Sequence, residues 1–172
     1  MVDLGWGNNS RAIAINNNGQ ILGVNSVFLN HNNEFIYSPS IGMQTIPIFS
    51  GALDVFSSDM NNNGEVVGEG DVIVAGIGTT HAFVYTSGGG TVDLNTLIDP
   101  NSGWILEQAT AMNDSGQIVG IGINPSGATD AFLLTPTPEP ATLSLLAVGG
   151  VALLRRRNFM PRSKQGLPTV CG

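Results

Sequence analysis

Residues 1–134 alternate short apolar runs with clusters of asparagine and glycine. Residues 12–15 and 21–22, for example, are apolar and flank the cluster Asn16-Asn17-Asn18-Gly19. Valine and isoleucine dominate these runs, and no twelve-residue stretch of this part shows a sustained helical period. Gly tolerates positive φ and Asn bonds to its own backbone in turns, so both residues end strands rather than extend them. The pattern predicts an all-β domain of short strands and tight turns.

The same twelve-residue pattern occurs three times, at residues 12–23, 57–68 and 109–120, which align without gaps. Each copy carries an Asn-x-x-Gly turn, and the three glycines lie 45 and 52 residues apart. We expect each glycine to take the positive-φ position of a tight reversal. The six turn residues are therefore candidate functional positions of the fold: Asn16, Gly19, Asn61, Gly64, Asn113 and Gly116.

One further echo follows all three turns and another follows the first two, and together they give the repeat its size. A phenylalanine recurs as Phe35, Phe83 and Phe132, and we expect all three to pack in the core. Residues 91–94, Thr-Val-Asp-Leu, have a looser copy at 43–46. Three or four strands in about 45–50 residues match one blade of a propeller. The predicted fold class is thus all-β short-strand repeats, propeller-like or an incomplete propeller, with repeats near 12–50, 57–97 and 109–134.

The triplet His81-Ala82-Phe83 follows the second Asn-x-x-Gly block. Over roughly residues 1–135 the chain resembles the bacterial extracellular HAF repeat, which is named after this triplet. The first copy has Asn33-Glu34-Phe35 and the third has Asp130-Ala131-Phe132 in its place. The resemblance implies a propeller-like β architecture and an extracellular setting, and it implies no known catalytic site.

The first residues, Val2-Asp3-Leu4-Gly5, resemble residues 92–95, which end the second repeat. We therefore expect the parent protein to be longer at its N-terminus, with a signal peptide that is missing here. Three repeats are fewer than the four to eight blades that close a propeller, so exposed sheet edges are expected. A natural, complete three-repeat domain is the alternative.

The composition changes at residue 135, where a Pro-rich linker, residues 135–140, begins. Residues 141–154 are fourteen uncharged and mostly apolar positions, and Arg155, Arg156 and Arg157 follow them. As a helix, this run spans about 21 Å, which is short for a bilayer unless the arginines snorkel. The arginines place that end in the cytoplasm and the β-repeat domain outside. We predict a transmembrane helix with its basic stop over 141–157 and a disordered tail over 158–172; a buried core helix is the alternative.

The order of these parts resembles the PEP-CTERM sorting tail of Gram-negative bacteria. Pro138, Glu139 and Pro140 match the triplet, residues 141–154 the helix, and residues 155–157 the arginine cluster. The resemblance implies recognition by an exosortase, a membrane protease-transferase, with an inner-membrane intermediate followed by release or transfer to the cell surface. It also implies an association with exopolysaccharide and biofilm production.

Charge is distributed unevenly between the two parts. Residues 1–136 carry twelve acidic residues and one base, Arg11, so their net charge is 1 − 12 = −11. Such a body offers no phosphate-neutralising patch, which excludes nucleic acid as a partner. The only cysteine is Cys171, so no disulfide can form within one chain.

Candidate chemistry is sparse. Asp59-Met60-Asn61-Asn62-Asn63-Gly64 resembles the start of a calcium loop, but its twelfth position is Gly70 rather than glutamate, and a β-turn explains all three copies. His81 belongs to the repeat triplet and is expected to be structural. Trp6 and Trp104 are expected to be buried, with a sugar-binding surface as the alternative. The sequence therefore predicts no catalytic residue, no metal and no cofactor.

These observations indicate an exported cell-surface or extracellular-matrix protein with a structural or interaction role, and not an enzyme. The alternative is a carbohydrate-binding, lectin-like repeat module that retains extracellular polysaccharide.

Overall fold

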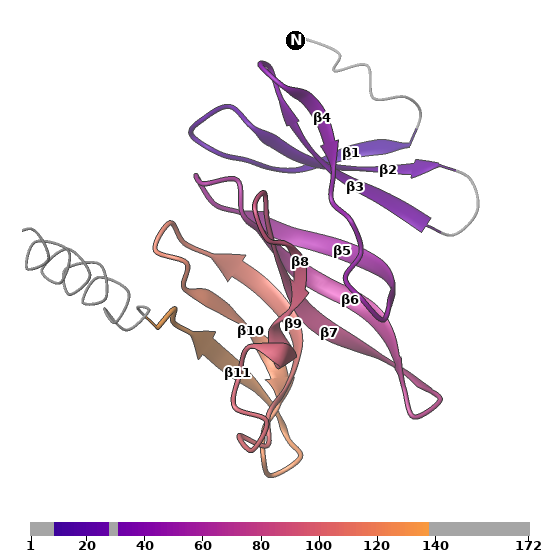
Figure 1. Cartoon of the computed structure of the whole chain (residues 1–172), viewed down its shortest axis with the longest axis vertical. Helices are drawn as coiled ribbons and strands as arrows, with labels where there is room; N and C mark the ends of the chain where they lie inside the picture. The colour runs from indigo at the N-terminus through magenta and orange to yellow at the C-terminus, as the bar shows by residue number, and fades with distance from the viewer. Residues whose placement is uncertain (1–8, 28–30, 138–172) are drawn as a thin grey trace, which may run out of the picture. The chain divides into compact units, whose positions relative to one another are not determined.

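The computed structural model describes residues 9–27 and 31–137 (Figure 1). The chain divides into two compact units, Met1–Pro136 and Thr137–Gly172, and the fold is that of the first. It is all-β, with three antiparallel sheets and no closed barrel among the described residues. Trp6, the Pro138-Glu139-Pro140 triplet, the predicted helix and its arginines, and the tail 158–172 lie outside the described residues.

Within each sheet the strands follow one another in chain order, joined by hairpins. The first sheet contains β1 (Ser10–Ile15), β2 (Ile21–Val27), β3 (His31–Ser38) and β4 (Gly42–Thr45). The second contains β5 (Ala52–Met60), β6 (Val66–Val74), β7 (Ile77–Thr86) and β8 (Gly90–Asp93). The third contains β9 (Ile105–Met112), β10 (Ile118–Ile123) and β11 (Thr129–Leu134).

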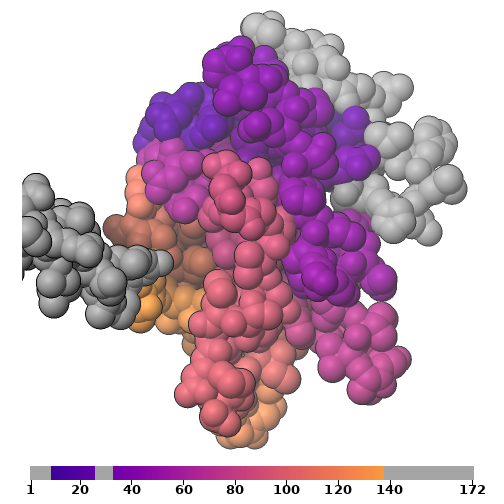
Figure 2. Space-filling view, viewed as in Figure 1, coloured from indigo at the N-terminus to yellow at the C-terminus, as the bar shows by residue number. Residues whose placement is uncertain are grey.

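Each sheet corresponds to one sequence repeat. The first strand of each sheet begins before the aligned segment, at Ser10, Ala52 and Ile105. The aligned segment includes only the last residues of that strand, next to the turn. β4 and β8 occupy equivalent places, as the echo between residues 43–46 and 91–94 predicted. A short 3-10 helix, η1 (Leu94–Thr96), follows β8, and the connection to β9 lies on the surface shown in Figure 2.

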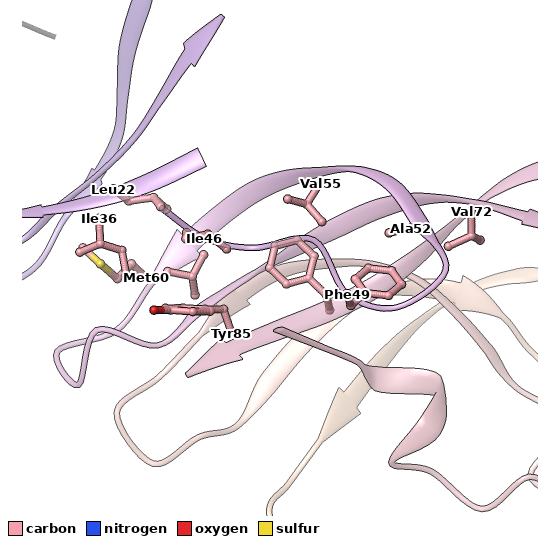
Figure 3. Close-up of a cluster of buried hydrophobic side chains, with 11 residues drawn as sticks. Leu22, Ile36, Ile46, Phe49, Ala52, Val55, Met60, Val72 and Tyr85 are labelled. Atoms are coloured by element: carbon pink, nitrogen blue, oxygen red, sulfur yellow. The ribbon is translucent and has the colours of Figure 1, made fainter. Parts of the chain in front are cut away.

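Two apolar clusters join the sheets. The first cluster lies between the first and second sheets and includes Leu22, Ile36, Met60, Val66 and Tyr85, with Ile46 and Phe49 from the connection between them (Figure 3). The second cluster joins Val67 and Ala82 of the second sheet to Leu106, Ala109 and Ile118 of the third. The second sheet is therefore covered on both faces, and four of its valines are buried: Val55, Val66, Val67 and Val72.

The recurring phenylalanine packs on a glycine of the neighbouring strand. Phe35, Phe83 and Phe132 are only 2%, 0% and 8% exposed, which confirms their predicted place in the core. Their cross-strand partners are the glycines that end the three aligned segments: Gly23, Gly68 and Gly120. A methyl group on Gly68 would meet the Phe83 ring at 2.9 Å, and one on Gly120 would meet the Phe132 ring at 2.6 Å. The absence of a side chain on the glycine thus makes room for the ring.

No helix formed by the described part of the chain is long and apolar enough to cross a membrane. The segment predicted to do so, residues 141–157, falls outside that part.

Candidate functional site

The three Asn-x-x-Gly turns share one local geometry. Gly19, Gly64 and Gly116 have φ of 71°, 76° and 74°, the left-handed conformation predicted for them. The N–H of each glycine donates to the main-chain oxygen of the leading asparagine, at 3.0–3.1 Å. The Oδ1 of Asn16, Asn61 and Asn113 accepts the N–H groups two and four positions later, all at 3.0 Å. The asparagine side chain thus closes its own turn.

The leading asparagines also connect the repeats. Asn16 Nδ2 donates to the main-chain oxygen of Asn61 at 3.0 Å, and Asn61 Nδ2 donates to that of Asn113 at 3.2 Å. Each amide therefore serves its own turn through Oδ1 and the next turn through Nδ2. We call the resulting stack of three turns the turn ladder.

The second residue of each turn adds another rung. The N–H of Asn17 donates to Asn62 Oδ1 at 2.8 Å, and the N–H of Asn62 donates to Asp114 Oδ1 at the same distance. Asn62 Nδ2 donates to Asp114 Oδ2 at 2.7 Å. Because two donors of Asn62, its main-chain N–H first, bond to the Asp114 carboxylate, the pKa of Asp114 lies below its ordinary value.

The turn ladder and the strand ends that enter it line a polar recess of about 320 Å³. Its wall contains Asn17, Asn62 and Asp114 from the turns, and Met60 and Met112 from the strand ends. Amide and carboxylate groups in a row offer alternating donors and acceptors, which can bind a polar ligand through hydrogen bonds.

Asp59, the candidate start of a calcium loop, lies beside this recess but has a structural partner. Its Oδ2 accepts the main-chain N–H of Met112 at 2.9 Å, which joins the second repeat to the third. Within residues 9–27 and 31–137, no group of three histidine, cysteine, aspartate or glutamate side chains is placed to hold a metal ion. The Asn61–Gly64 segment is the β-turn that the repeat pattern predicted.

His81 of the His-Ala-Phe triplet pairs with Asp93. His81 Nδ1 lies 2.7 Å from Asp93 Oδ2, and the two side chains are 19% and 16% exposed. Asp93 also caps η1, because its Oδ1 accepts the N–H of Asn95 at 2.8 Å. The pair fixes the outer strand β8 to β7 and positions the start of the connection to the third sheet. The two residues are twelve apart in the sequence, and no pattern there pointed to their contact.

Glu34 is the residue that sequence reasoning missed most clearly. It is 2% exposed on β3, and its Oε2 has no hydrogen-bond partner among the described residues. Desolvation by burial raises the pKa of Glu34 to about 7, although the polar groups of Ser57 and the positive charge of Arg11 act in the opposite direction. The other two repeats place Ala82 and Ala131 at this position, so the alignment gave a hint that the site is apolar.

Trp104 packs against the second cluster and is partly buried, which agrees with the burial expected for this residue. Trp6, the other candidate for a sugar-binding surface, lies outside the described residues.

Replacing Asn61 with alanine is expected to destabilise the fold by about 2 kcal/mol, because Asn61 is 4% exposed and the N–H groups of Asn63 and Glu65 would lose their acceptor. Asn113→Ala is the matched control and should cost about 1 kcal/mol, since its turn is exposed and water can replace the lost bonds. Equilibrium urea unfolding of the two variants gives the comparison. Equal losses would contradict a role for Asn61 in joining the repeats.

The fold and the turn ladder define this molecule as a β-repeat protein whose units are joined by polar turns and apolar clusters. A family model described as a protein of unknown function (DUF3466) matches residues 5–130, and the chain belongs to that family. A second model, the PEP-CTERM protein-sorting motif, matches residues 136–158. Comparison with the curated proteins and with the solved structures found no match.

The sorting motif covers Pro138, Glu139 and Pro140, the apolar run and the arginine cluster, as the sequence predicted. It supports an exported protein that is processed by exosortase, a membrane enzyme, and sent to the cell surface of a Gram-negative bacterium.

Proposed function

We propose that this protein is a non-enzymatic component of the cell surface or extracellular matrix, where its β-repeats act as a structural or interaction module. The sorting motif at residues 136–158 carries this proposal, because it directly follows the compact unit that ends at Pro136. The motif directs the protein to the cell surface, and the β-repeat domain is the part that remains outside the cell. The same proposal includes three finer points: a likeness of the repeats to extracellular HAF repeats, a transmembrane segment at residues 141–157, and an association with biofilm.

The domain has the contacts that a stable extracellular module needs. Its sheets are joined by two apolar clusters and by main-chain and amide hydrogen bonds of the turn ladder. Neither kind of contact depends on a disulfide or a metal, so the fold is indifferent to the redox state of its surroundings. Repeat proteins of this construction commonly present extended binding surfaces.

The intact mass of the mature protein, recovered from its own host, tests the sorting step. We expect a C-terminus near Pro138–Pro140 and recovery from the cell surface or the medium. A matched strain that lacks exosortase should keep residues 141–172, with the protein in the inner membrane. Full-length protein in the inner membrane of both strains would overturn the sorting proposal and leave a tail-anchored protein.

Substitution of Glu139 by alanine provides a second control within the chain. It changes the Pro-Glu-Pro triplet and leaves both the apolar run and the three arginines in place. Retention of the tail in this variant would show that processing reads the triplet rather than the hydrophobic segment alone.

A carbohydrate-binding role is the second candidate, and the polar recess at the turn ladder favours it. Asn17, Asn62 and Asp114 line that recess, and amide and carboxylate groups are suited to sugar hydroxyls. Retention of the full chain on the host's exopolysaccharide, weakened by Asn62→Ala but not by Asn124→Ala, would favour this candidate over a purely structural role.

A further inference from the structure

β11 is an edge strand of the third sheet, although its equivalents in the other two sheets are interior strands. β3 and β7 are each covered by an outer strand, β4 and β8, whereas no strand lies beyond β11 among the described residues. The two outer strands have four residues each and run antiparallel to the strands they cover. Within the described part of the chain, the third repeat thus lacks a strand that the other two repeats have.

The equivalence of the repeats shows which main-chain groups of β11 face this edge. The N–H of Ile46, just after β4, donates to the main-chain oxygen of Glu34 at 2.8 Å, so Glu34 turns its main-chain groups toward β4. Ala131 is the equivalent of Glu34, and every second residue of an antiparallel strand faces the same neighbour. The main-chain groups of Ala131 and Leu133 therefore point away from β10. They are the groups with which an added strand would pair.

One of these groups already has an acceptor within the chain. Asp130 Oδ1 accepts the main-chain N–H of Ala131 at 2.8 Å. A strand that ends as β4 does, with its last N–H on the oxygen of the residue equivalent to Ala131, leaves this bond in place. The bond from Asp130 is therefore compatible with an outer strand of the length seen in the other two repeats.

A mostly apolar recess of about 270 Å³ lies along the same edge. Four consecutive residues of β11, 131–134, line it, and consecutive residues of a strand alternate between the two faces. A recess that all four residues line must pass along the free edge of the strand. Its other wall comes from β9 and from the connection before β9, through Ile98, Ser102, Trp104 and Leu106. An apolar side chain of an added strand, placed opposite Leu134, would enter this recess.

The connection that forms the outer wall is held by its own hydrogen bonds. Asn95 Oδ1 accepts the N–H of Leu106 at 2.7 Å, and Asn95 Nδ2 donates to the main-chain oxygen of Leu106 at 2.9 Å. The N–H of Ser102 donates to the main-chain oxygen of Asp99 at 2.9 Å, and Ser102 Oγ accepts the N–H of Trp104 at 3.3 Å. A preformed wall loses little conformational entropy when a peptide binds to it.

The second repeat shows what chemistry the added strand needs. There, His81 on β7 lies 2.7 Å from Asp93 on β8. In the third repeat Asp130 stands in the place of His81, so the acidic member of the pair is already on β11. A basic side chain in the place of Asp93 would restore the pair with the two roles exchanged, whereas an acidic one would meet Asp130 as a like charge. The net charge of residues 1–136, 1 − 12 = −11, favours a basic strand as well.

We propose that the open edge of β11 binds an extended peptide segment of another protein, which adds to the third sheet as its outer strand. The segment carries a basic residue opposite Phe132 and aliphatic residues opposite Ala131, Leu133 and Leu134. The methylene stem of the basic residue lies over the apolar recess, and its charge lies at Asp130. This partner rests on the interaction role proposed above, and peptide binding to the purified chain can fail while processing by exosortase succeeds.

Fluorescence anisotropy of labelled peptides, with the full chain in mild detergent, tests this partner. The probe is Gly-Gly-Val-Val-Lys-Leu-Asn, which is residues 89–95 with valine in the place of Thr91 and lysine in the place of Asp93. The lysine peptide should bind about fivefold more tightly than the same peptide with aspartate at that position. Methylation of the main-chain nitrogen of its second valine should abolish binding, because that N–H pairs with the oxygen of Leu133.

A pair of chain variants locates the charge that the peptide reads. Asp130→Asn keeps an acceptor for the N–H of Ala131 and removes the carboxylate charge. In this variant the lysine and aspartate peptides should bind within about twofold of each other. Asp99→Asn, at an exposed position of the connection, changes the net charge equally and is the matched control, which should keep the difference between the peptides.

Three peptide results would overturn the proposal. They are no binding of the lysine peptide at about 1 mM, equal binding of the N-methylated peptide, and a preference for lysine that survives Asp130→Asn. Sedimentation of the chain alone adds a fourth. A dimer that the lysine peptide dissociates would assign the edge of β11 to a second copy of this chain and would likewise overturn a peptide partner from another protein.

Discussion

Gly68→Ala is expected to destabilise the domain by about 4 kcal/mol or to prevent its folding, a loss that few single substitutions reach. A methyl group at Gly68 would lie 2.0 Å from the main-chain oxygen of Phe56 on the neighbouring strand β5. Rotation of a side chain cannot relieve a clash with backbone, so β5 would have to move away from its neighbour β6. Urea unfolding of the full chain, followed by tryptophan fluorescence, gives the free energy.

Two other glycines serve as controls for this effect. Gly78→Ala should change stability by less than about 0.5 kcal/mol, because the nearest atom, Ile73 Cδ1, is 3.9 Å from the added methyl group. Gly23→Ala should fall between the two, since its closest neighbour is the Phe35 ring at 2.7 Å and the nearest backbone oxygen is 3.1 Å away. A Gly68 variant within about 1 kcal/mol of wild type, or no less stable than the Gly23 variant, would show that the β5–β6 pairing is looser than described.

Glu34 should make the domain less stable as pH rises from about 4.5 to about 7. Its pKa is about 7 in the folded protein and near 4.5 in the unfolded chain, so the folded state binds the proton more tightly. Below pH 4.5 Glu34 is protonated in both the folded and the unfolded state, so its burial carries no charge penalty. Above pH 7 Glu34 is ionised in both states, and burial of its charge lowers the free energy of unfolding by about 3 kcal/mol. Urea unfolding at pH 4.5, 6 and 8 measures the slope.

Glu34→Gln should remove most of this slope and be more stable than wild type at pH 8. Glu34→Ala, which introduces the alanine found at the equivalent positions 82 and 131, should also lose most of the slope. Burial, and to a lesser extent Asp71, also raises the pKa of Glu69, so a smaller slope of the same sign should remain in both variants. Glu107→Gln on β9 is the control, and its slope should follow wild type. The pKa of Asp114 is lowered from its ordinary value of 3.8, so Asp114 changes the stability only below pH 3.8, outside the range of this test. An unchanged slope in the Glu34 variants would assign the pH dependence to other groups.

Much of the local structure could be predicted because it depends on short sequence separations. The Asn-x-x-Gly pattern determines a turn within four residues, and all three glycines have the positive φ that it requires. The recurrence of Phe35, Phe83 and Phe132 once per repeat likewise indicated buried positions, which the structure confirms. These features needed no knowledge of how the repeats pack.

The contacts between repeats could not be predicted in the same way. Asn61 contacts Asn16 and Asn113 across 45 and 52 residues, and the sequence shows that the three are alike without showing that they touch. The burial of Glu34 depends on the second sheet covering β3. The alanines at the equivalent positions 82 and 131 hinted at an apolar site, but they did not show which part of the chain covers it. The His81–Asp93 pair depends on the register of β7 with β8, which the turn at residues 87–89 sets only when the hairpin forms.

The unequal spacing of the three turns, 45 and then 52 residues, has a consequence for how such a gene can change. Neighbouring units recognise each other through the turn and the strand ends, so residues inserted in a hairpin or in a connection leave that recognition intact. A duplicated unit would meet neighbours that already carry the matching asparagine and the matching apolar face. The number of units could therefore increase or decrease over evolutionary time without the invention of a new interface.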